Sequence, residues 1–203
     1  MTSIAIRTGP IPFRLELGEA LELSDAELLE LCGRNPELRI ERSAEGDLEV
    51  MTPSGSESAH RNAEVLTALM IWAKQDGTGE VFDSSGGFSL PDGAVRAPDA
   101  SWVLRSRLDA LPAGARKGFL PLCPDFVVEV RSPSDTLPLL RAKMDELRAN
   151  GARLGWLIDP EERTVEIYRP GSEPEHLRAP DSIRGDPELP GFELDLRPVW
   201  EPL

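Results

Sequence analysis

The clearest pattern along the chain is the strand-like run at residues 125–131, whose apolar interior carries one charged residue. It reads Asp-Phe-Val-Val-Glu-Val-Arg, with Glu129 inside the apolar stretch. A short continuous apolar run predicts a strand that is buried on both faces. A carboxylate on such a strand costs several kcal/mol unless it is paired with a cation or binds a metal ion. Glu129 is therefore the first candidate functional residue.

A second acidic residue stands at the end of another strand-like run, thirty residues earlier. Asp99 follows Pro98 and directly precedes the run 100–104, which can pair beside the strand of Glu129. Asp99 and Glu129 are then either parts of a neutralised structural pair or two ligands of a hard metal ion. The residues alone leave this choice open, because an Asp after a proline can also simply cap a turn.

The first half of the chain alternates between helical and strand patterns. Ser24 followed by Glu27 and a leucine-rich stretch predicts a capped helix that ends at Gly33. The runs 38–42 and 47–51 alternate apolar and polar residues across a link with one glycine, which predicts an antiparallel hairpin. A wide apolar stripe predicts a long helix from about 57 to 74. Strands are expected at 80–84, 87–90 and 100–104, with a short helix and loop at 108–118.

The second half repeats the change of pattern. We expect Ser132–Asp135 to cap a helix over about 137–150 that ends at Gly151. A buried strand at 155–159 should form a hairpin with 164–168, and 190–196 contains one more strand-like alternation. Helix, antiparallel strands, helix and strand in this order predict an α/β domain with a mixed sheet.

Length and composition set the remaining limits. The 203 residues are enough for one domain with its own core, and the two cysteines show no zinc spacing and are expected to be free thiols. We expect no membrane span and no signal peptide, and therefore a cytoplasmic protein. The four tryptophans lie in apolar runs and are expected in the core. His60 and His176 have no partner at the spacing of a hydrolase triad.

The charge of the chain argues against indiscriminate binding to nucleic acid. The net charge is -14, and residues 1–50 carry 11 acidic and 5 basic residues. A sequence-independent DNA binder usually has the opposite sign. From 105 to 169, however, 11 basic residues face 10 acidic ones. The central segment is thus much less repulsive to a phosphate backbone than the whole chain.

A lysine and a third acid complete a candidate constellation. Lys143 lies in the helix after the Glu129 strand, and that helix must cross back over the sheet. Glu64 lies at the border of the apolar stripe of the long helix. Two carboxylates suit Mg²⁺, which prefers oxygen ligands and keeps several waters. The ion would activate a water and polarise a phosphate oxygen, and a nearby lysine would orient that water or stabilise the developing charge. Alternatively, Lys143 and Glu64 are ordinary solvated residues.

These residues resemble a known family. The similarity is carried by Pro98-Asp99, the block 123–135, Lys143, Gly151 and the runs 156–160 and 165–169, and it extends to 38–51, 61–64 and 79–88. Together these segments resemble the Uma-two family of restriction-endonuclease-like proteins, a branch of the PD-(D/E)XK nuclease superfamily. The resemblance covers roughly residues 36–171, and the central block is its most specific part.

The resemblance implies a fold and a set of site residues. It implies a restriction-endonuclease-like mixed β-sheet core flanked by helices, with an N-terminal helix and β-hairpin. Asp99 and Glu129 match the metal-binding acids, and Glu64 matches a helix-borne acid found in part of the superfamily. The superfamily usually has a lysine two residues after the second acid, where this chain has Arg131. Lys143 would be that lysine, relocated to the next helix. Leu147 stands where the family often has an aromatic residue.

The expected organisation and function follow from that resemblance. Residues 1–35 would form an N-terminal arm and helix of the same domain, 36–171 the nuclease-like core, and 172–203 a C-terminal extension. The expected function is a Mg²⁺-dependent DNA endonuclease, with Mn²⁺ as a substitute ion. A homodimer would let one site per subunit cut each strand of a duplex. The alternative is a catalytically silent interaction module on the same fold, since a fold can outlive its chemistry.

Overall fold

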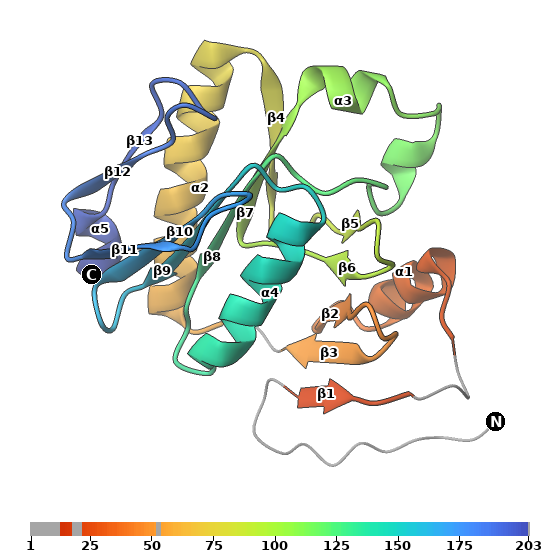
Figure 1. Ribbon diagram of the computed structural model, residues 1–203. Helices are drawn as coiled ribbons and strands as arrows, with labels where there is room; N and C mark the ends of the chain where they lie inside the picture. Colours follow the sequence, from red (N-terminus) through yellow and green to blue (C-terminus); the bar gives the residue numbers. More distant parts are fainter. Residues whose placement is uncertain (1–12, 18–21, 52–53, 203) are drawn as a thin grey trace.

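The protein is built from a six-stranded and a five-stranded β-sheet, with a separate two-stranded sheet in the C-terminal segment and helices packed around them (Figure 1). The computed structural model describes residues 13–17, 22–51 and 54–202. The extended arm expected at residues 1–12 lies outside the described residues. The expected α/β class, with a mixed sheet flanked by helices, is confirmed.

The larger sheet has six strands in the order β11-β10-β9-β8-β7-β4. Strands β8 and β9 are parallel, and the other neighbours are antiparallel. Parallel strands need a crossover connection, and helix α4 (Leu137–Ala149) provides it. The strands are β4 (Gly79–Asp83), β7 (Ala100–Leu104), β8 (Phe126–Val130), β9 (Leu154–Asp159), β10 (Thr164–Tyr168) and β11 (Glu175–Arg178).

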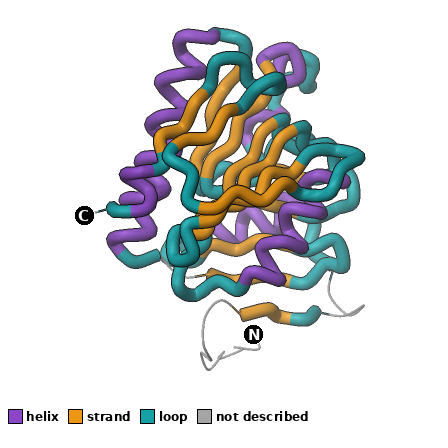
Figure 2. The backbone as a smooth tube through the Cα atoms, turned by 60° about the vertical axis from the view of Figure 1, so that its left-hand side comes forward, coloured by secondary structure: helices purple, strands orange, loops and turns teal. Residues whose placement is uncertain are grey.

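The two faces of strand β8 pack against different helices. Phe126, Val128 and Val130 belong to a core that includes the apolar stripe of helix α2 (Ser56–Asp76). Val127 belongs to a second core, which includes Met144 and Leu147 of α4. Residues two apart on a strand share a face, so Glu129 lies on the α4 side. Figure 2 shows helices on either side of these strands.

The smaller sheet has the order β1-β3-β2-β6-β5 and is antiparallel throughout. Helix α1 (Asp25–Arg34) packs on it through Leu28. The predicted capping box is confirmed: the Ser24 hydroxyl accepts from the Glu27 amide, and the Glu27 carboxylate accepts from the Ser24 amide. The strands are β1 (Phe13–Leu15), β2 (Arg39–Arg42), β3 (Leu48–Met51), β5 (Phe88–Ser89) and β6 (Val95–Arg96).

The C-terminal segment is part of the main core. Its elements are β12 (Ser182–Arg184), β13 (Glu193–Asp195) and helix α5 (Arg197–Trp200). The ring of Phe192 stacks on Trp156 with centroids 5.5 Å apart and lies 5.4 Å from Trp72. Residues 172–203, expected as an extension, therefore complete the core beside α2.

Three sequence expectations need correction. Helix α4 has Thr136 as its N-cap, without a side-chain bond, because Asp135 turns back and accepts from the amide and hydroxyl of Ser132. The strand around Phe88 pairs with β6 across the Pro91–Gly93 turn and joins the smaller sheet, not β7. The segment 108–118 contains the end of helix α3 (Arg105–Asp109) and a 3-10 turn, η2 (Ala115–Lys117). Strands β1, β6, β11 and β12 and helix α5 were not anticipated.

Other expectations are confirmed. All four tryptophans are buried. Cys32 and Cys123 are free thiols, and burial raises the pKa of the Cys123 thiol to about 12. Within the part of the chain that the structure describes, no helix combines the length and apolar character needed to cross a bilayer.

Candidate functional site

Glu129 and Lys143 meet on the α4 side of the large sheet. Lys143 Nζ lies 2.8 Å from Glu129 Oε1, and both side chains are at least nine-tenths buried. The contact is an ion pair without hydrogen-bond alignment, so Glu129 Oε1 has no hydrogen-bond donor among the described residues. Lys143 reaches Glu129 because α4 crosses back over the sheet with Met144 and Leu147 facing inward. The expected approach of Lys143 to Glu129 is confirmed.

Asp99 stands beside Glu129 on the neighbouring strand. The antiparallel register pairs Ala100 with Val128, so one residue further Asp99 is opposite Glu129 on the same face of the sheet. The Asp99 carboxylate is buried and accepts a 2.9 Å hydrogen bond from the Val130 amide. This bond fixes the carboxylate at the C-terminal end of β8. The two predicted acids thus share one end and one face of the sheet.

Glu41 is a third carboxylate in the same place, and sequence reasoning missed it. Glu41 lies on β2, is 1% exposed, and its Oε1 accepts from Lys143 Nζ at 2.9 Å and from the Ala97 amide at 3.2 Å. Its Oε2 lies 3.3 Å from Nη1 of Arg96. Lys143 is therefore held between two buried carboxylates, one on each sheet.

Arg39 lies between the carboxylates of Asp99 and Glu41 and contacts both. Its Nη1 donates to Asp99 Oδ1 at 3.2 Å, and its Nη2 lies 3.5 Å from Glu41 Oε1 and donates to the Ala97 carbonyl at 2.7 Å. We call the five residues Arg39, Glu41, Asp99, Glu129 and Lys143 the charged cluster. The Arg39 side chain is 31% exposed, against 10% or less for the other four. The cluster therefore meets solvent mainly at Arg39.

Sequence reasoning missed Arg39 and Glu41 for one reason. The run Arg39–Arg42 alternates around Ile40, and the simple interpretation of such a run places its polar side in water. In the folded protein, Glu41 on that side of β2 contacts Lys143 of α4 and lies next to Arg96 of the neighbouring strand β6. The only local sign is the density of charges, Arg-Ile-Glu-Arg, in a strand of four residues.

The pKa values of the two buried glutamates, Glu41 and Glu129, are shifted in opposite directions. Burial is the largest cause that raises the pKa of Glu129, to about 7; Lys143 opposes it, and the carboxylates of Asp99 and Glu41 add repulsion. Burial also acts on Glu41, but Lys143, Arg39 and Arg96 outweigh it and hold its pKa at about 2. Burial lowers the pKa of Lys143, yet Glu129 and Glu41 together leave it above the ordinary value. Lys143 and Glu41 are charged at neutral pH, and Glu129 is poised to lose its proton there.

The donor set fits a hard divalent cation held by two acids. No group of three or more His, Cys, Asp or Glu residues in the described ranges is arranged to hold a metal ion. Mg²⁺ does not require such a cage, because it is usually bound by one or two carboxylates and keeps its waters. Asp99 and Glu129 could supply these oxygens. Glu129 Oε1 is buried and has the Lys143 ammonium as its charged neighbour, without an aligned hydrogen bond, so it can accept a metal ion as a further partner.

Glu64 is not brought into the charged cluster. It lies on α2, which packs on the opposite face of the sheet from α4. Its side chain is 41% exposed, and the described residues give it an ion-pair distance of 3.7 Å to His60. A catalytic role for Glu64 stays a prediction.

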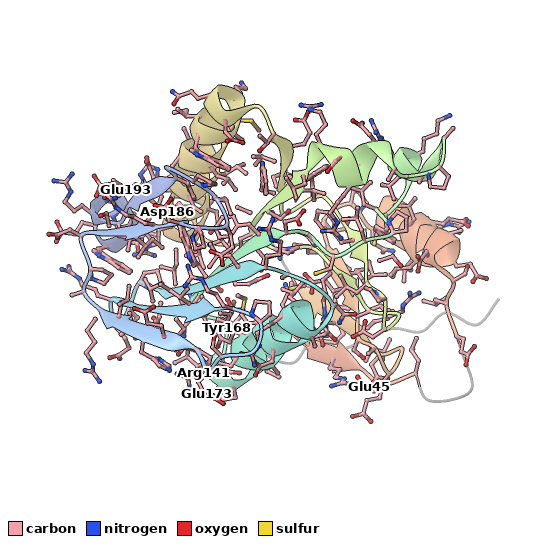
Figure 3. All side chains as sticks on the ribbon, turned by 45° about the horizontal axis from the view of Figure 1, so that its top comes forward. Glu45, Arg141, Tyr168, Glu173, Asp186 and Glu193 are labelled. Carbon is pink, nitrogen blue, oxygen red and sulfur yellow. The ribbon has the colours of Figure 1, made fainter. Side chains whose placement is uncertain are left out.

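Arg131 and Arg141, which lie close in sequence to Glu129 and Lys143, are paired with other acids. Arg131, at the position of the superfamily's usual lysine, pairs with Asp159 at 2.8 Å. Arg141 pairs with Glu166, which also accepts from the hydroxyl of Tyr168 at 2.7 Å, and Figure 3 shows Arg141 close to Tyr168. Among the described residues, Glu129 therefore has Lys143 as its ion-pair partner.

The comparisons with known proteins agree with this architecture. The arrangement is that of the restriction-endonuclease-like folds, and the profile of the Uma2 family, described as "Putative restriction endonuclease", matches residues 25–197. The chain belongs to this family. It is similar to a crystal structure described as "a putative nuclease belonging to DUF820 from Anabaena variabilis", with a TM-score of 0.71 and 22% identity over 88% of this chain and 98% of that chain. Curated proteins gave no match.

Proposed function

We propose that this protein is a Mg²⁺-dependent endonuclease that hydrolyses DNA phosphodiester bonds, with Mn²⁺ as a substitute ion. One observation carries the proposal: Lys143 Nζ lies 2.8 Å from Glu129 Oε1, at the strand end where Asp99 stands alongside. Two acids and one lysine at one point are the groups that metal-assisted phosphodiester hydrolysis uses. Membership in the family supports the same reaction class.

Each residue of the charged cluster has a distinct part in this chemistry. Asp99 and Glu129 would hold the ion, which when bound polarises a phosphate oxygen and makes an attacking water more acidic. Lys143 would orient that water or stabilise the negative charge that develops on the phosphate. Glu41 keeps the Lys143 ammonium in place through its own contact at 2.9 Å. Arg39, the most exposed member, would contact the incoming phosphate.

The contacts of Lys143 bear on the alternative of a purely structural ion pair. A buried pair with a single partner loses about 3–5 kcal/mol when that partner is removed. Here Lys143 has two carboxylate partners, Glu129 and Glu41. Neutralising Glu129 therefore leaves the lysine paired. The cluster can give up one Lys143 contact to a metal ion without stranding a buried charge.

The net charge of the chain and the burial of the cluster support the alternative, a catalytically silent interaction module. The net charge of -14 repels a DNA backbone, and four of the five cluster residues are nearly closed to solvent. A module of this kind would use the fold without metal or cleavage. A homodimeric nuclease would instead present two clusters to a duplex, one for each strand.

Nicking of supercoiled plasmid tests the proposal. The wild type should nick DNA in Mg²⁺ or Mn²⁺ and stop when EDTA is added. Asp99→Asn and Glu129→Gln should abolish nicking, and Lys143→Ala should slow it about 10²–10³-fold, the usual size for losing one electrostatic stabiliser. Asp145→Asn is the matched control, because Asp145 lies on the same helix with its side chain 54% exposed. A folded wild type that never nicks DNA in either metal, across salt and pH, would overturn the proposal.

A further inference from the structure

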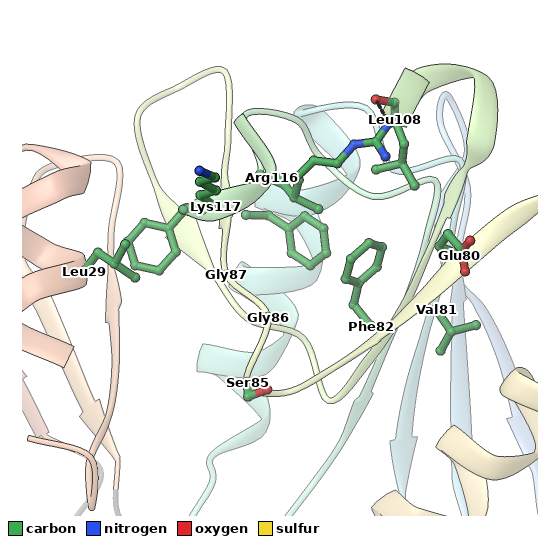
Figure 4. Close-up of a pocket in the computed structure, with 14 residues that line it drawn as sticks. Leu29, Glu80, Val81, Phe82, Ser85, Gly86, Gly87, Leu108, Arg116 and Lys117 are labelled. Atoms are coloured by element: carbon green, nitrogen blue, oxygen red, sulfur yellow. Dashed lines mark hydrogen bonds between the residues drawn. The ribbon is translucent and has the colours of Figure 1, made fainter. Parts of the chain in front are cut away.

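A pocket of about 480 Å³ lies beside the β4 edge of the large sheet, and its lining includes no residue of the charged cluster. Figure 4 shows the side chains that line it. Its apolar walls include the rings of Phe82 and Phe119, with Leu29 of α1 at one side. Its rim carries the two consecutive basic residues Arg116 and Lys117 of the η2 turn. This volume is in the range of pockets that hold small organic ligands.

In the wall of the pocket, the backbone at Gly87 lies very close to the ring of Phe119. A Cβ at Gly87 would lie 2.3 Å from the Phe119 ring, so only glycine allows this approach. The segments are held together by paired backbone bonds: Leu120 N donates to the Gly87 carbonyl, and Ser89 N donates to the Leu120 carbonyl. Phe82 packs edge-on against the buried Phe88 with centroids 5.5 Å apart. Both aromatic walls are therefore set in position before any ligand arrives.

The register places this pocket on the same face of the sheet as the charged cluster. Phe82 pairs with Ser101, and Ser101 pairs with Val127. Asp99 and Glu129 are each two residues from these partners, so all of these side chains share one face. Strand spacing places the Cα of Phe82 roughly 8 Å from that of Asp99 and roughly 12 Å from that of Glu129. That span corresponds to about two to four nucleotide steps along a DNA strand.

The charge near the pocket is opposite to that of the whole chain. Residues 105–118 contain four basic residues and one acidic residue, a net of +3 in a chain of -14, and the pocket lining itself carries Arg116 and Lys117 against one acid, Glu80, which pairs with Arg105. Arg116 uses Nη2 for its contacts with Leu108 O and Asp109 and is 58% exposed. Lys117 is exposed and has no ion-pair partner among the described residues. The rim can therefore take an anion without breaking a buried ion pair.

From this arrangement we propose that the pocket binds one nucleotide of a single DNA strand. The base lies against the rings of Phe82 and Phe119, and the phosphate is bound by Arg116 and Lys117. Stacking on aromatic rings next to basic side chains is how proteins hold unpaired strands. The proposal rests on the proposed nuclease function, and it names the form of DNA that this function would act on: a strand with unpaired bases flanking the cut.

Fluorescence anisotropy of labelled oligonucleotides in EDTA tests this directly, without any cleavage. The double variant Arg116→Ala/Lys117→Ala should weaken single-strand binding at least tenfold and lower the slope of log affinity against log salt by about 0.7, the value for one phosphate of a single strand that is no longer neutralised. Phe119→Leu, which keeps an apolar side chain over Gly87, should weaken binding about fivefold or more. Arg184→Ala/Arg197→Ala is the matched control, because both side chains are exposed on the C-terminal elements.

These binding measurements test the pocket proposal separately from the proposed nuclease function. If the rim variant and the control bind single strands equally well, the pocket proposal is overturned whatever the plasmid assay shows. Tighter binding to duplex than to single strand, unaffected by Phe119→Leu, would also overturn it. Binding of a free deoxynucleoside monophosphate without binding of an oligonucleotide would also overturn the proposal, because the occupant would then be a free nucleotide and not a strand. Selective loss in the rim and Phe119 variants supports the proposal, even where the wild type does not cleave.

Discussion

Lys143 and Glu41 are 102 residues apart in the sequence, yet Nζ of the lysine lies 2.9 Å from Oε1 of the glutamate. This contact ties helix α4, which crosses the large sheet, to strand β2 of the small sheet. It also gives Lys143 a partner that does not belong to the expected metal pair. The position of the lysine is thus fixed by the N-terminal sheet as well as by its own helix.

Glu41→Gln should be strongly destabilising. Neutralising Glu41 removes the one carboxylate that Lys143, Arg39 and Arg96 share, so three cations are left with only their other acidic partners. Breaking a buried charge network in this way costs about 3–5 kcal/mol. Urea denaturation of the purified variant measures the change in the free energy of unfolding.

Glu49→Gln is the control for this change. Glu49 also pairs with Arg96, at 2.7 Å, but its side chain is 33% exposed. Arg96 keeps Glu146 and Glu41 when Glu49 is neutralised. We expect a loss of at most about 1 kcal/mol, as for partly exposed pairs. Equal losses in the two variants would show that Glu41 has no special place in the network.

The stability of the wild type should fall as pH rises from about 5 to 8. Folding raises the pKa of Glu129 from 4.5 to about 7, so its contribution is fully present below pH 4.5 and is lost as pH rises through 7. The loss is at most about 3 kcal/mol, the equivalent of that pKa difference. Glu41 has the opposite sign, but its contribution is lost only as pH falls from 4.5 towards 2.

The Glu129→Gln variant isolates the contribution of Glu129 to this pH dependence of stability. The variant should be flatter between pH 5 and 8 than the wild type, and at pH 8 it should be the more stable of the two. Adding Mg²⁺ to the wild type should reduce the slope, because a bound cation stabilises the charged carboxylate. Melting temperatures across pH, with and without Mg²⁺, provide both comparisons. Identical pH slopes for variant and wild type would assign the dependence to other groups.

Lys143→Met should strengthen metal binding while slowing cleavage. The lysine ammonium lies beside Glu129 Oε1, where it competes with a divalent cation for the same oxygen. Without it, Glu129 and Glu41 lose their shared cation, so the variant should be less stable than the wild type at pH 8 and recover towards pH 5. Isothermal titration with Mn²⁺ should give a lower Kd than for the wild type. An unchanged Kd would mean that Lys143 does not compete with the ion.

Gly87→Ala should destabilise the pocket wall. The new methyl group would meet the Phe119 ring at 2.3 Å and force it to move, at a cost of about 1–3 kcal/mol. Gly86→Ala is the matched control, since the nearest atoms to its Cβ are 3.4 Å away. Thermal melting of both variants measures the difference. Two equally stable variants would show that the Phe119 ring is free to leave Gly87.

The sequence by itself determined the local elements and three members of the charged cluster. The capping box at Ser24, the hairpin of β2 and β3 and the buried run of β8 follow from short-range periodicity and from residue chemistry. Glu129 was visible because a charge inside an apolar run demands a partner. Asp99 and Lys143 followed from their places at a strand end and on the crossover helix. For Glu64 the family resemblance implied a catalytic role, and the fold places the residue on α2, across the sheet from the cluster.

Only the tertiary structure decided what surrounds these residues. Whether the polar side of β2 meets water or α4 depends on how two sheets pack, and this packing buries Glu41 and brings Arg39 to Asp99. The same holds for Phe192, which fills the core from the C-terminal segment, and for the aromatic pocket between β4 and η2. Periodicity reports which residues of one element share a face. It does not report which element will cover that face, because that depends on contacts between segments far apart in the chain.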